Sequence, residues 1–248
     1  MAGHSKWAQI KRKKAEVDAR RGKVFTRLIK EIAVAARLGG GDERANSRLR
    51  QAMLAAKKAN MPAENIKRAV QRGTGELPGL SYEQAAFEGY GPGGVAIMLE
   101  VMTDNRKRTV AEVRHLFSRY GGHLGESGCV SWMFKKGGLV IVENENVVED
   151  ELLESVLEGN GDDFSEAGDV YEITSPAKNL HSVRESLERH HFKIRSVELT
   201  MIPTNSVKVE GEDAQKLLRL LDALEEQDDV QKISSNFDMD EAAMVEME

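Results

Sequence analysis

The stretch AFEGYGPGGVAIMLEVM at residues 86–102 decides the fold class of this 248-residue chain. Two apolar runs flank the turn sequence GYGPGG at 89–94, a pattern that predicts a β-hairpin. The same glycines match the spacing G-x-G-x-x-G of dinucleotide-binding loops. Such a loop opens a helix, whereas a strand pattern follows here, so a hairpin turn is the better interpretation.

Outward from this hairpin, the chain contains two separated halves of one α/β domain. A helical pattern at 105–120 follows the hairpin, and a strand–helix–strand unit lies near the C-terminus at 206–237. The C-terminal unit alone cannot close a core of a sheet covered by helices. We therefore expect one domain formed by residues 78–130 and 205–248 and split by an insertion.

The insertion, residues 131–204, shows the order βαββαβ, which is typical of a ferredoxin-like domain. Strand patterns lie at 130–134, 139–142, near Phe164, 170–174 and 193–200, and helical patterns at 147–157 and 176–190. Residues 135–138 indicate a break between the first two strands. The predicted fold class is α+β with three domains, namely an N-terminal helical domain and two ferredoxin-like α/β domains, one inserted in the other.

Three amphipathic helices are predicted before the hairpin, at 20–38, 46–60 and 62–73. A linker at 74–81 follows them, so we place a helical domain at 21–77. The first helix carries cations opposite its apolar face, at Arg20, Lys23, Arg27, Lys30 and Arg37. Residues 1–20 form a basic arm with too few apolar side chains to bury much surface.

The net charge of −6 is an average over two unlike parts. Residues 1–75 contain nineteen Lys and Arg but six Asp and Glu, a net charge of +13, whereas residues 76–248 have a net charge of −19. A solvated charged face usually mixes both signs, so this excess indicates that the helical domain binds the phosphates of nucleic acid, either DNA or ribosomal RNA. No sequence-reading motif accompanies it. The predicted nucleic-acid-binding residues are Lys6, Trp7, Lys11, Arg12, Lys13, Lys14, Arg20, Lys23, Arg27, Lys30, Arg37, Arg106, Lys107 and Arg108.

Two of these assignments have an ordinary alternative. Trp7 stands among cations in a polar segment, and it either stacks on a base or packs against the helical domain. Arg106, Lys107 and Arg108 occupy the first turn of a helix, where the helix dipole disfavours cations. They either hold a phosphate together with the exposed amides of that turn or are scattered solvent-facing charges.

The remaining features argue against catalysis. No catalytic motif and no metal-ligand spacing occurs, and neither a cofactor nor a small-molecule substrate is implied. Twelve Asp and Glu residues and no Lys or Arg lie between 143 and 172, either as a docking face for a basic partner or as solvated surface. A single cysteine, Cys129, the lack of a secretory signal and the lack of a membrane-spanning run predict a cytoplasmic protein.

Several motifs together resemble the YebC/PmpR family. They are MAGHSKW at 1–7, GKVFTR at 22–27, NMP at 60–62, RGTG at 72–75, EGYGPGG at 88–94 and TDNR at 103–106. The resemblance covers nearly the whole chain and implies three domains and a cytoplasmic, non-enzymatic regulator of gene expression. Some members are assigned as DNA-binding transcriptional regulators, and relatives, including mitochondrial ones, as translation factors on the ribosome. The sequence alone does not choose between these, and a protein-interaction scaffold that uses the acidic domain is a further alternative.

Overall fold

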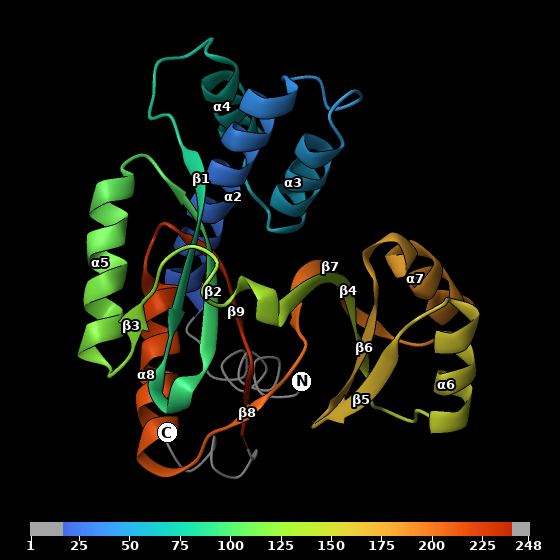
Figure 1. Ribbon diagram of the computed structural model, residues 1–248. Helices are drawn as coiled ribbons and strands as arrows, with labels where there is room; N and C mark the ends of the chain where they lie inside the picture. The colour runs from blue at the N-terminus through green and yellow to red at the C-terminus, as the bar shows by residue number, and fades with distance from the viewer. Residues whose placement is uncertain (1–16, 240–248) are drawn as a thin grey trace.

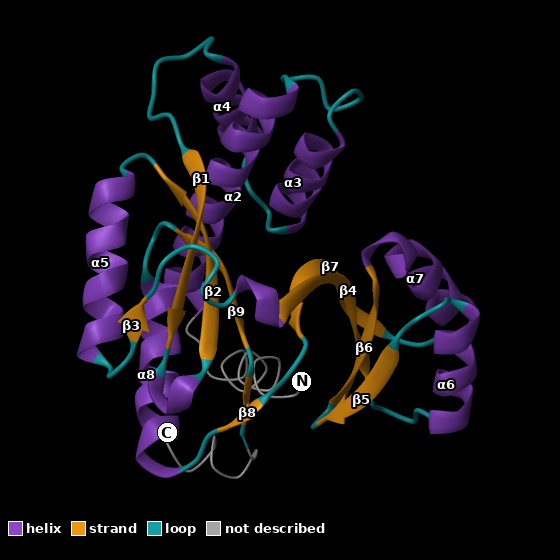
Figure 2. Cartoon of the chain, in the orientation of Figure 1, coloured by secondary structure: helices purple, strands orange, loops and turns teal. Residues whose placement is uncertain are grey.

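A computed structural model describes residues 17–239 of the chain (Figure 1). Three regions within that range each have a hydrophobic core. We call them the helical region (17–76), the split region (82–133 and 204–239) and the inserted region (134–203). Helices alone build the first region, and antiparallel sheets with helices build the other two (Figure 2). This arrangement confirms the predicted α+β class.

The helical region contains three helices, α2 (Val17–Gly39), α3 (Ser47–Lys58) and α4 (Ala63–Thr74). Their apolar stripes meet in a core that includes Ile32, Leu49 and Ile66, as the periodicity predicted. At Gly73, α4 comes so close to α2 that a Cβ would lie 2.4 Å from the carbonyl oxygen of Ala33. Glycine is therefore required at this crossing.

The motif that joins α3 to α4 is a helix-ending turn. Asn60 adopts a left-handed backbone with φ of 58°. Its N–H donates to the carbonyl of Lys57 over 3.0 Å, and the N–H of Met61 donates to that of Ala56 over 2.9 Å. This bonding satisfies the last carbonyls of α3, and Pro62 then precedes the first turn of α4.

The split region is built from eight main elements. They are β1 (Glu83–Tyr90), β2 (Ala96–Thr103), α5 (Arg106–Arg119), β3 (His123–Leu124), β8 (Val207–Lys208), α8 (Gly211–Glu226), β9 (Val230–Ser235) and β10 (Phe237–Asp238). Four strands form an antiparallel sheet in the order β3-β1-β2-β9. Helices α5 and α8 pack on the same core, with Phe117 and Leu221 fully buried. The last long strand of the chain thus completes the sheet that the hairpin begins.

The connections of this sheet differ from the expected ferredoxin-like order. Both hairpin strands precede α5, so the chain order begins ββα instead of βαβ. Strand β8 does not join the main sheet but pairs with β10 in a separate parallel pair. The turn sequence at 89–94 correctly predicted the hairpin strands β1 and β2. The pairing of β8 could not be predicted in the same way, because it depends on contacts between residues far apart in the sequence.

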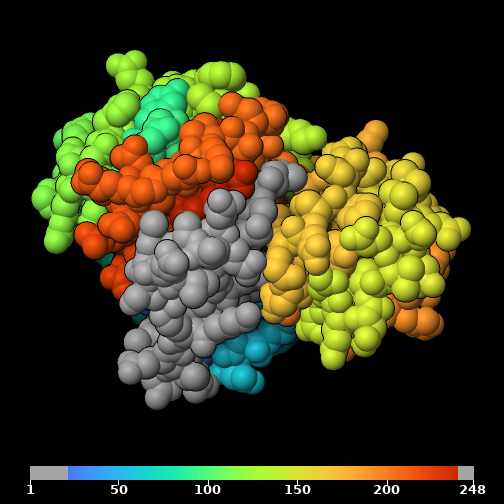
Figure 3. All heavy atoms as spheres, turned by 90° about the horizontal axis from the view of Figure 1, so that it is seen from below, coloured from blue at the N-terminus to red at the C-terminus, as the bar shows by residue number. Residues whose placement is uncertain are grey.

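The inserted region has the predicted βαββαβ order. Its elements are β4 (Phe134–Glu143), α6 (Glu149–Glu158), β5 (Asp163–Ala167), β6 (Val170–Pro176), α7 (Leu180–Arg189) and β7 (Ile194–Pro203). The antiparallel sheet has the order β5-β6-β4-β7, and α6 and α7 pack on the core that includes Val140 and Ile173. Viewed from below, this region (yellow) forms a lobe beside the split region (Figure 3).

One predicted strand is wrong. The expected strand at 130–134 is instead a short 3-10 helix, η2 (Ser131–Met133), followed directly by β4. The expected break at 135–138 does not exist, because β4 runs without interruption through Gly137 and Gly138. A Cβ on Gly138 would lie 2.5 Å from Oγ of Ser175, so this glycine allows close packing in a strand and does not mark a turn.

Candidate nucleic-acid interface

Part of the cationic face of α2, at Arg27 and Lys30, lies against the split region. Arg27 Nη2 donates to the carbonyl of Glu225 over 2.7 Å, and Lys23 Nζ lies 3.6 Å from the carboxylate of Glu226. Both acceptors belong to the last turn of α8, whose free carbonyls attract cations. Arg27 therefore has its acceptor within the protein, whereas Lys23, with 43% of its side chain exposed, also stays accessible to solvent.

Lys30 is the most buried of these cations, with 6% of its side chain exposed. Its Nζ donates to Oδ1 of Asp229 over 2.6 Å and to the carbonyl of Asp228 over 2.8 Å. The same ammonium lies 5.5 Å from the ring centre of Tyr82. An ammonium held in this way cannot reach a phosphate without breaking a buried ion pair, so the predicted solvent-facing position of Lys30 is wrong.

Asp229 connects the helical region to the start of α5. Its Oδ2 accepts hydrogen bonds from Oγ1 of Thr109 over 2.6 Å and from Nη2 of Arg108 over 2.9 Å. Burial opposes the ionisation of Asp229, but the hydrogen bonds from Lys30, Thr109 and Arg108 outweigh it and hold the pKa of this carboxyl well below its usual range. We call Lys30, Arg108, Thr109 and Asp229 the Asp229 clamp.

At the start of α5, fewer cations and backbone N–H groups are available to a phosphate than the sequence predicted. Arg106 and Lys107 are exposed, but Arg108 binds Asp229 and also donates to Asp104 over 2.9 Å. The amide of Arg108 donates to Oδ1 of Asn105 over 3.1 Å, so this first-turn N–H already has an acceptor. Two of the three predicted cations are therefore accessible to a phosphate.

Of the other predicted nucleic-acid-binding residues, the structure describes the side chain of one, Arg37. Arg37 is exposed and donates to Oγ of Ser81 over 2.8 Å. The side chain of Arg20 and all atoms of Lys6, Trp7, Lys11, Arg12, Lys13 and Lys14 lie outside the part of the chain that the structure describes.

Exposed cations that the sequence reasoning did not single out lie on α3 and α4. Lys57 and Lys58 end α3, where the helix dipole favours positive charge. Lys67, Arg68 and Arg72 are exposed along α4. A signal for them was present, because the excess of cations extends to residue 75 and these positions alternate with the apolar stripes of their helices.

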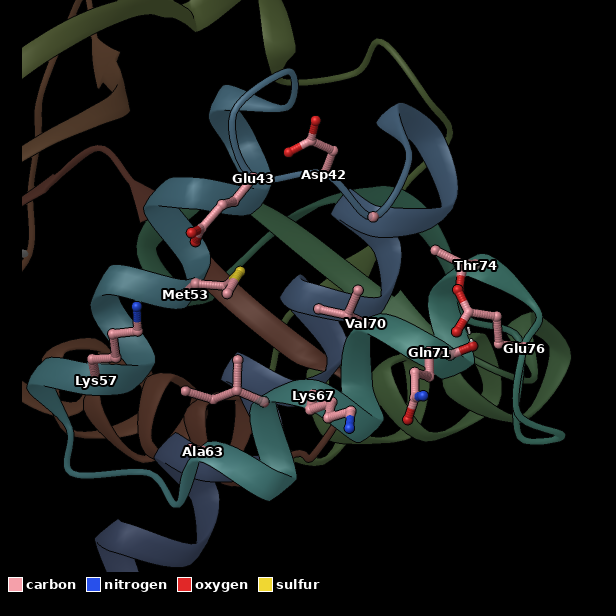
Figure 4. A pocket seen from close by; sticks show the side chains of 12 residues that line it. Asp42, Glu43, Met53, Lys57, Ala63, Lys67, Val70, Gln71, Thr74 and Glu76 are labelled. Atoms are coloured by element: carbon pink, nitrogen blue, oxygen red, sulfur yellow. Dashed lines mark hydrogen bonds between the residues drawn. The ribbon is translucent and has the colours of Figure 1, made fainter.

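An open groove of about 590 Å³ lies between α3 and α4 (Figure 4). Apolar side chains such as Met53 line part of it. In Figure 4, Lys57 and Lys67 lie on its lower side and Asp42 and Glu43 on its upper side. Because charges of both signs line the groove, it is a poor site for a polyanion, and we assign the phosphate-binding surface to the exposed cations around it.

The acidic surface of the inserted region is concentrated on α6. Ion pairs with Lys193 and Arg195 neutralise some carboxylates at the ends of the sheet. On α6, Leu153 and Leu157 are 43% and 64% exposed and lie one turn apart. The exposed carboxylates beside them are Asp150, Glu151 and Glu154. This helix face therefore combines negative charge with apolar side chains that no other described element covers.

Among residues 17–239, no group of three His, Cys, Asp or Glu side chains is placed to hold a metal ion. Within the same range, no helix is long and apolar enough to cross a membrane.

Nearly the whole chain is similar to known proteins of one family. The family model described as the TACO1/YebC protein N-terminal domain matches residues 5–76, and the model described as the TACO1/YebC second and third domain matches residues 82–237. A "Probable transcriptional regulatory protein" of Pelotomaculum thermopropionicum is 55% identical over 97% of this chain and all of its own length. One with the same description from Natranaerobius thermophilus is 52% identical over 98% of this chain and 99% of its own.

A solved structure has the same fold. The crystal structure of the conserved hypothetical protein Aq1575 from Aquifex aeolicus superposes with a TM-score of 0.80 at 48% identity. The match covers 92% of this chain and 94% of that one. With both family models matched in order and relatives above 50% identity over their full length, the chain belongs to the TACO1/YebC family.

Proposed function

We propose that this protein is a cytoplasmic, non-enzymatic regulator of gene expression that binds DNA through the exposed cations of its helical region. The observation that carries this proposal is the set of exposed cations on α3 and α4, in a region with few carboxylates. The description of the relatives as probable transcriptional regulatory proteins supports DNA as the partner. Contacts to phosphate position a protein on nucleic acid without reading its sequence.

The proposed binding residues follow from accessibility. Those on the helical region are Arg37, Lys57, Lys58, Lys67, Arg68 and Arg72, and Arg106 and Lys107 add a second contact at α5. We also assign the basic arm to this surface, with Lys6, Trp7, Lys11, Arg12, Lys13, Lys14 and Arg20. Arg27 and Lys30 instead hold the helical and split regions together, and Arg108 binds Asp229 within the split region.

The remaining charges favour one orientation on the nucleic acid. The carboxylates of α6 would repel a phosphate backbone, so we place the inserted region away from the bound strand. The Asp229 clamp ties α2 to the split region through buried hydrogen bonds.

The salt dependence of binding tests this assignment. Lys57→Gln with Lys58→Gln should weaken binding to duplex DNA and reduce the slope of log K against log salt by up to about 2, since each lost phosphate contact contributes about 0.9. A matched control, Lys178→Gln with Arg184→Gln, removes two exposed cations from the inserted region and should leave the slope unchanged. An unchanged slope in the first variant would contradict the proposal.

The same titration separates DNA from the ribosomal alternative. A structured fragment of ribosomal RNA is titrated beside the duplex DNA at equal salt. Tighter binding to the DNA supports a role in transcription. Binding to the RNA that is at least tenfold tighter would favour a translation factor on the ribosome, with the same cations as the contact surface.

The exposed leucines of α6 favour one second candidate function, docking of a protein partner. The occupant that fits is a basic amphipathic helix, whose apolar face would meet Leu153 and Leu157 and whose cations would meet the surrounding carboxylates. Leu153→Ser with Leu157→Ser should weaken binding of a synthetic Lys/Leu amphipathic helix at least tenfold. Leu54→Ser, at an exposed leucine of α3, serves as the control. Equal binding by all three proteins would eliminate this candidate.

A further inference from the structure

Trp132 is the largest apolar side chain that the described residues leave in solvent, and 70% of it is exposed. It belongs to η2, at the junction where the split region leads into β4 of the inserted region. Its neighbours Val130 and Met133 are buried in a small core with Phe134. The turn therefore packs through the residues on both sides of Trp132 and directs the indole outward.

The backbone that carries Trp132 is held by a buried carboxylate. Glu88, on β1, accepts the N–H groups of Gly128, Val130 and Ser131, each over 2.8 Å. Burial raises the pKa of Glu88, but these three donors outweigh it and lower the pKa below its usual value. The carboxylate is therefore ionised and fully engaged, and it stabilises the loop that leads into η2.

The indole itself has a defined orientation. Its Nε1–H donates to the carbonyl of Cys129 over 3.1 Å, and the hydroxyl of Tyr90 donates to the same carbonyl over 2.9 Å. On the other side, the carbonyl of Met133 accepts both the N–H and the hydroxyl of Thr204. Because the one polar atom of the indole already has a partner, a ligand can interact with Trp132 only through the apolar ring.

The charges around Trp132 have both signs, with Glu88 and Glu126 near Cys129 on one side and two exposed lysines further along the chain. No Asp or Glu occurs from 127 to 142, and Lys135 and Lys136 follow Trp132 on β4 with exposed side chains. Asp162 lies 3.4 Å from Lys135, a contact that exposed groups exchange easily for phosphate. Proteins stack unpaired bases on exposed aromatic rings and bind the phosphates with nearby cations, and here an oriented exposed indole has two exposed lysines within four residues of it in the chain.

We propose that Trp132 is a stacking site for an unpaired nucleobase and that one of Lys135 and Lys136, whose side chains leave β4 on opposite faces, binds an adjoining phosphate. This inference rests on the proposed nucleic-acid function and extends it from phosphate contacts on duplex to contact with a single-stranded or unstacked segment. Stacking on one aromatic ring contributes a factor of about 5 to 150 in affinity and depends little on which base is present.

Fluorescence isolates this site because the chain has two tryptophans, Trp7 and Trp132. In the Trp7→Phe protein all indole emission comes from Trp132. Titration with a single-stranded oligonucleotide of mixed sequence should quench that emission, because a base in van der Waals contact with the excited indole quenches it by electron transfer. The fully paired duplex of the same sequence should bind with little quenching, since its bases are not free to stack on the indole.

Affinity measurements on the full chain complete the test. Trp132→Leu should weaken binding of the single strand about tenfold and change binding of the duplex less than twofold, while Trp132→Phe restores most of the loss. Leu199→Ala, at an exposed apolar residue of the inserted region, is the control and should change neither. Because Trp132 is exposed, the melting temperature of Trp132→Leu should stay within about 2 °C of the wild type.

The possible results separate this inference from the proposed function. Duplex binding without quenching by the single strand, or equal single-strand affinity in Trp132→Leu, overturns the stacking site and leaves the proposed function standing. An equal loss for both nucleic acids in Trp132→Leu also overturns it, because the contact would not require an unpaired base. A wild-type protein that binds neither nucleic acid overturns the proposed function and the stacking site together.

Discussion

Replacement of Asp229 by asparagine removes one charge from the clamp and keeps its shape. The side chains of Asp229 and Lys30 are 3% and 6% exposed, so the ammonium of Lys30 would stay buried without a counter-charge. Loss of one partner of a buried ion pair costs about 3–5 kcal/mol. Lys30 could keep the asparagine oxygen and the carbonyl of Asp228 as acceptors, but Arg108 and Thr109 would then face the amide NH2 in place of an acceptor, so we expect a loss of at least about 3 kcal/mol.

Urea unfolding of the full chain at pH 7 measures this loss. For an m-value of about 2–3 kcal/mol/M, the midpoint should fall by roughly 1 M. Lys30→Met together with Asp229→Asn should lose about 2 kcal/mol less than the sum of the single variants, because the two residues act as a pair. Lys23→Gln, which removes an exposed contact in the same interface, should cost less than about 0.5 kcal/mol.

The dependence of the unfolding free energy on pH below 7 gives a second measure of the contribution of Asp229. The pKa of Asp229 is lowered in the folded protein, so its ionisation contributes stability above its unfolded pKa of about 4. That contribution is lost as the pH falls toward the native pKa, and the wild type should lose stability more steeply below about pH 4 than Asp229→Asn. A change in stability below 0.5 kcal/mol for Asp229→Asn at pH 7, or strictly additive single variants, would refute the reasoning.

Two further changes test the packing of the other regions. Gly73→Ala should destabilise the helical region by about 1–3 kcal/mol, because its methyl group would overlap the carbonyl of Ala33. Gly22→Ala, at an open helical site, should instead stabilise this region by about 0.5–1 kcal/mol. Thermal melts of both variants measure the two effects, and equal effects would contradict the prediction. Burial and then the hydrogen bond to Glu149 raise the pKa of Tyr171 to about 12, so the neutral phenol contributes stability below pH 10 that is lost as the pH rises toward 12. Denaturant unfolding at pH 9 and pH 11.5 should show a larger alkaline loss in the wild type than in Tyr171→Phe, and equal losses would rule out this titration.

Local patterns in the sequence identified most of the fold. The 3.6-residue periodicity located the helices, and the GYGPGG turn located the hairpin, because both depend on neighbours within a few residues. The error at 135–138 arose where two glycines serve packing in a strand. Gly137 and Gly138 lie close to Ile202 and Ser175, residues whose positions the local sequence does not encode.

The candidate site was harder to predict than the fold. A lysine opposite an apolar stripe suggests exposure to solvent, and Lys30 matches that pattern fully. Its partner Asp229 lies 199 residues further along the chain, where the surrounding EEQDD sequence resembles an ordinary acidic helix end. The sign of the charge on the helical region could be predicted, but which of its faces is covered depends on how the C-terminal part of the chain returns.

Because 199 residues separate Lys30 from Asp229, the N-terminal partner of this ion pair is synthesised long before the C-terminal one. Translation releases α2 long before residue 229, so in a growing chain the cations of α2 face water without their acceptors, and the central sheet lacks its edge strand β9. The contact between α2 and Asp229 forms late because residue 229 is synthesised late. Its entropic cost is nevertheless moderate, because the entropy of closing a loop grows only logarithmically with loop length. We expect nascent chains that end before residue 225 to attract polyanions more strongly than the finished protein, because the cations of α2 then have no internal acceptor.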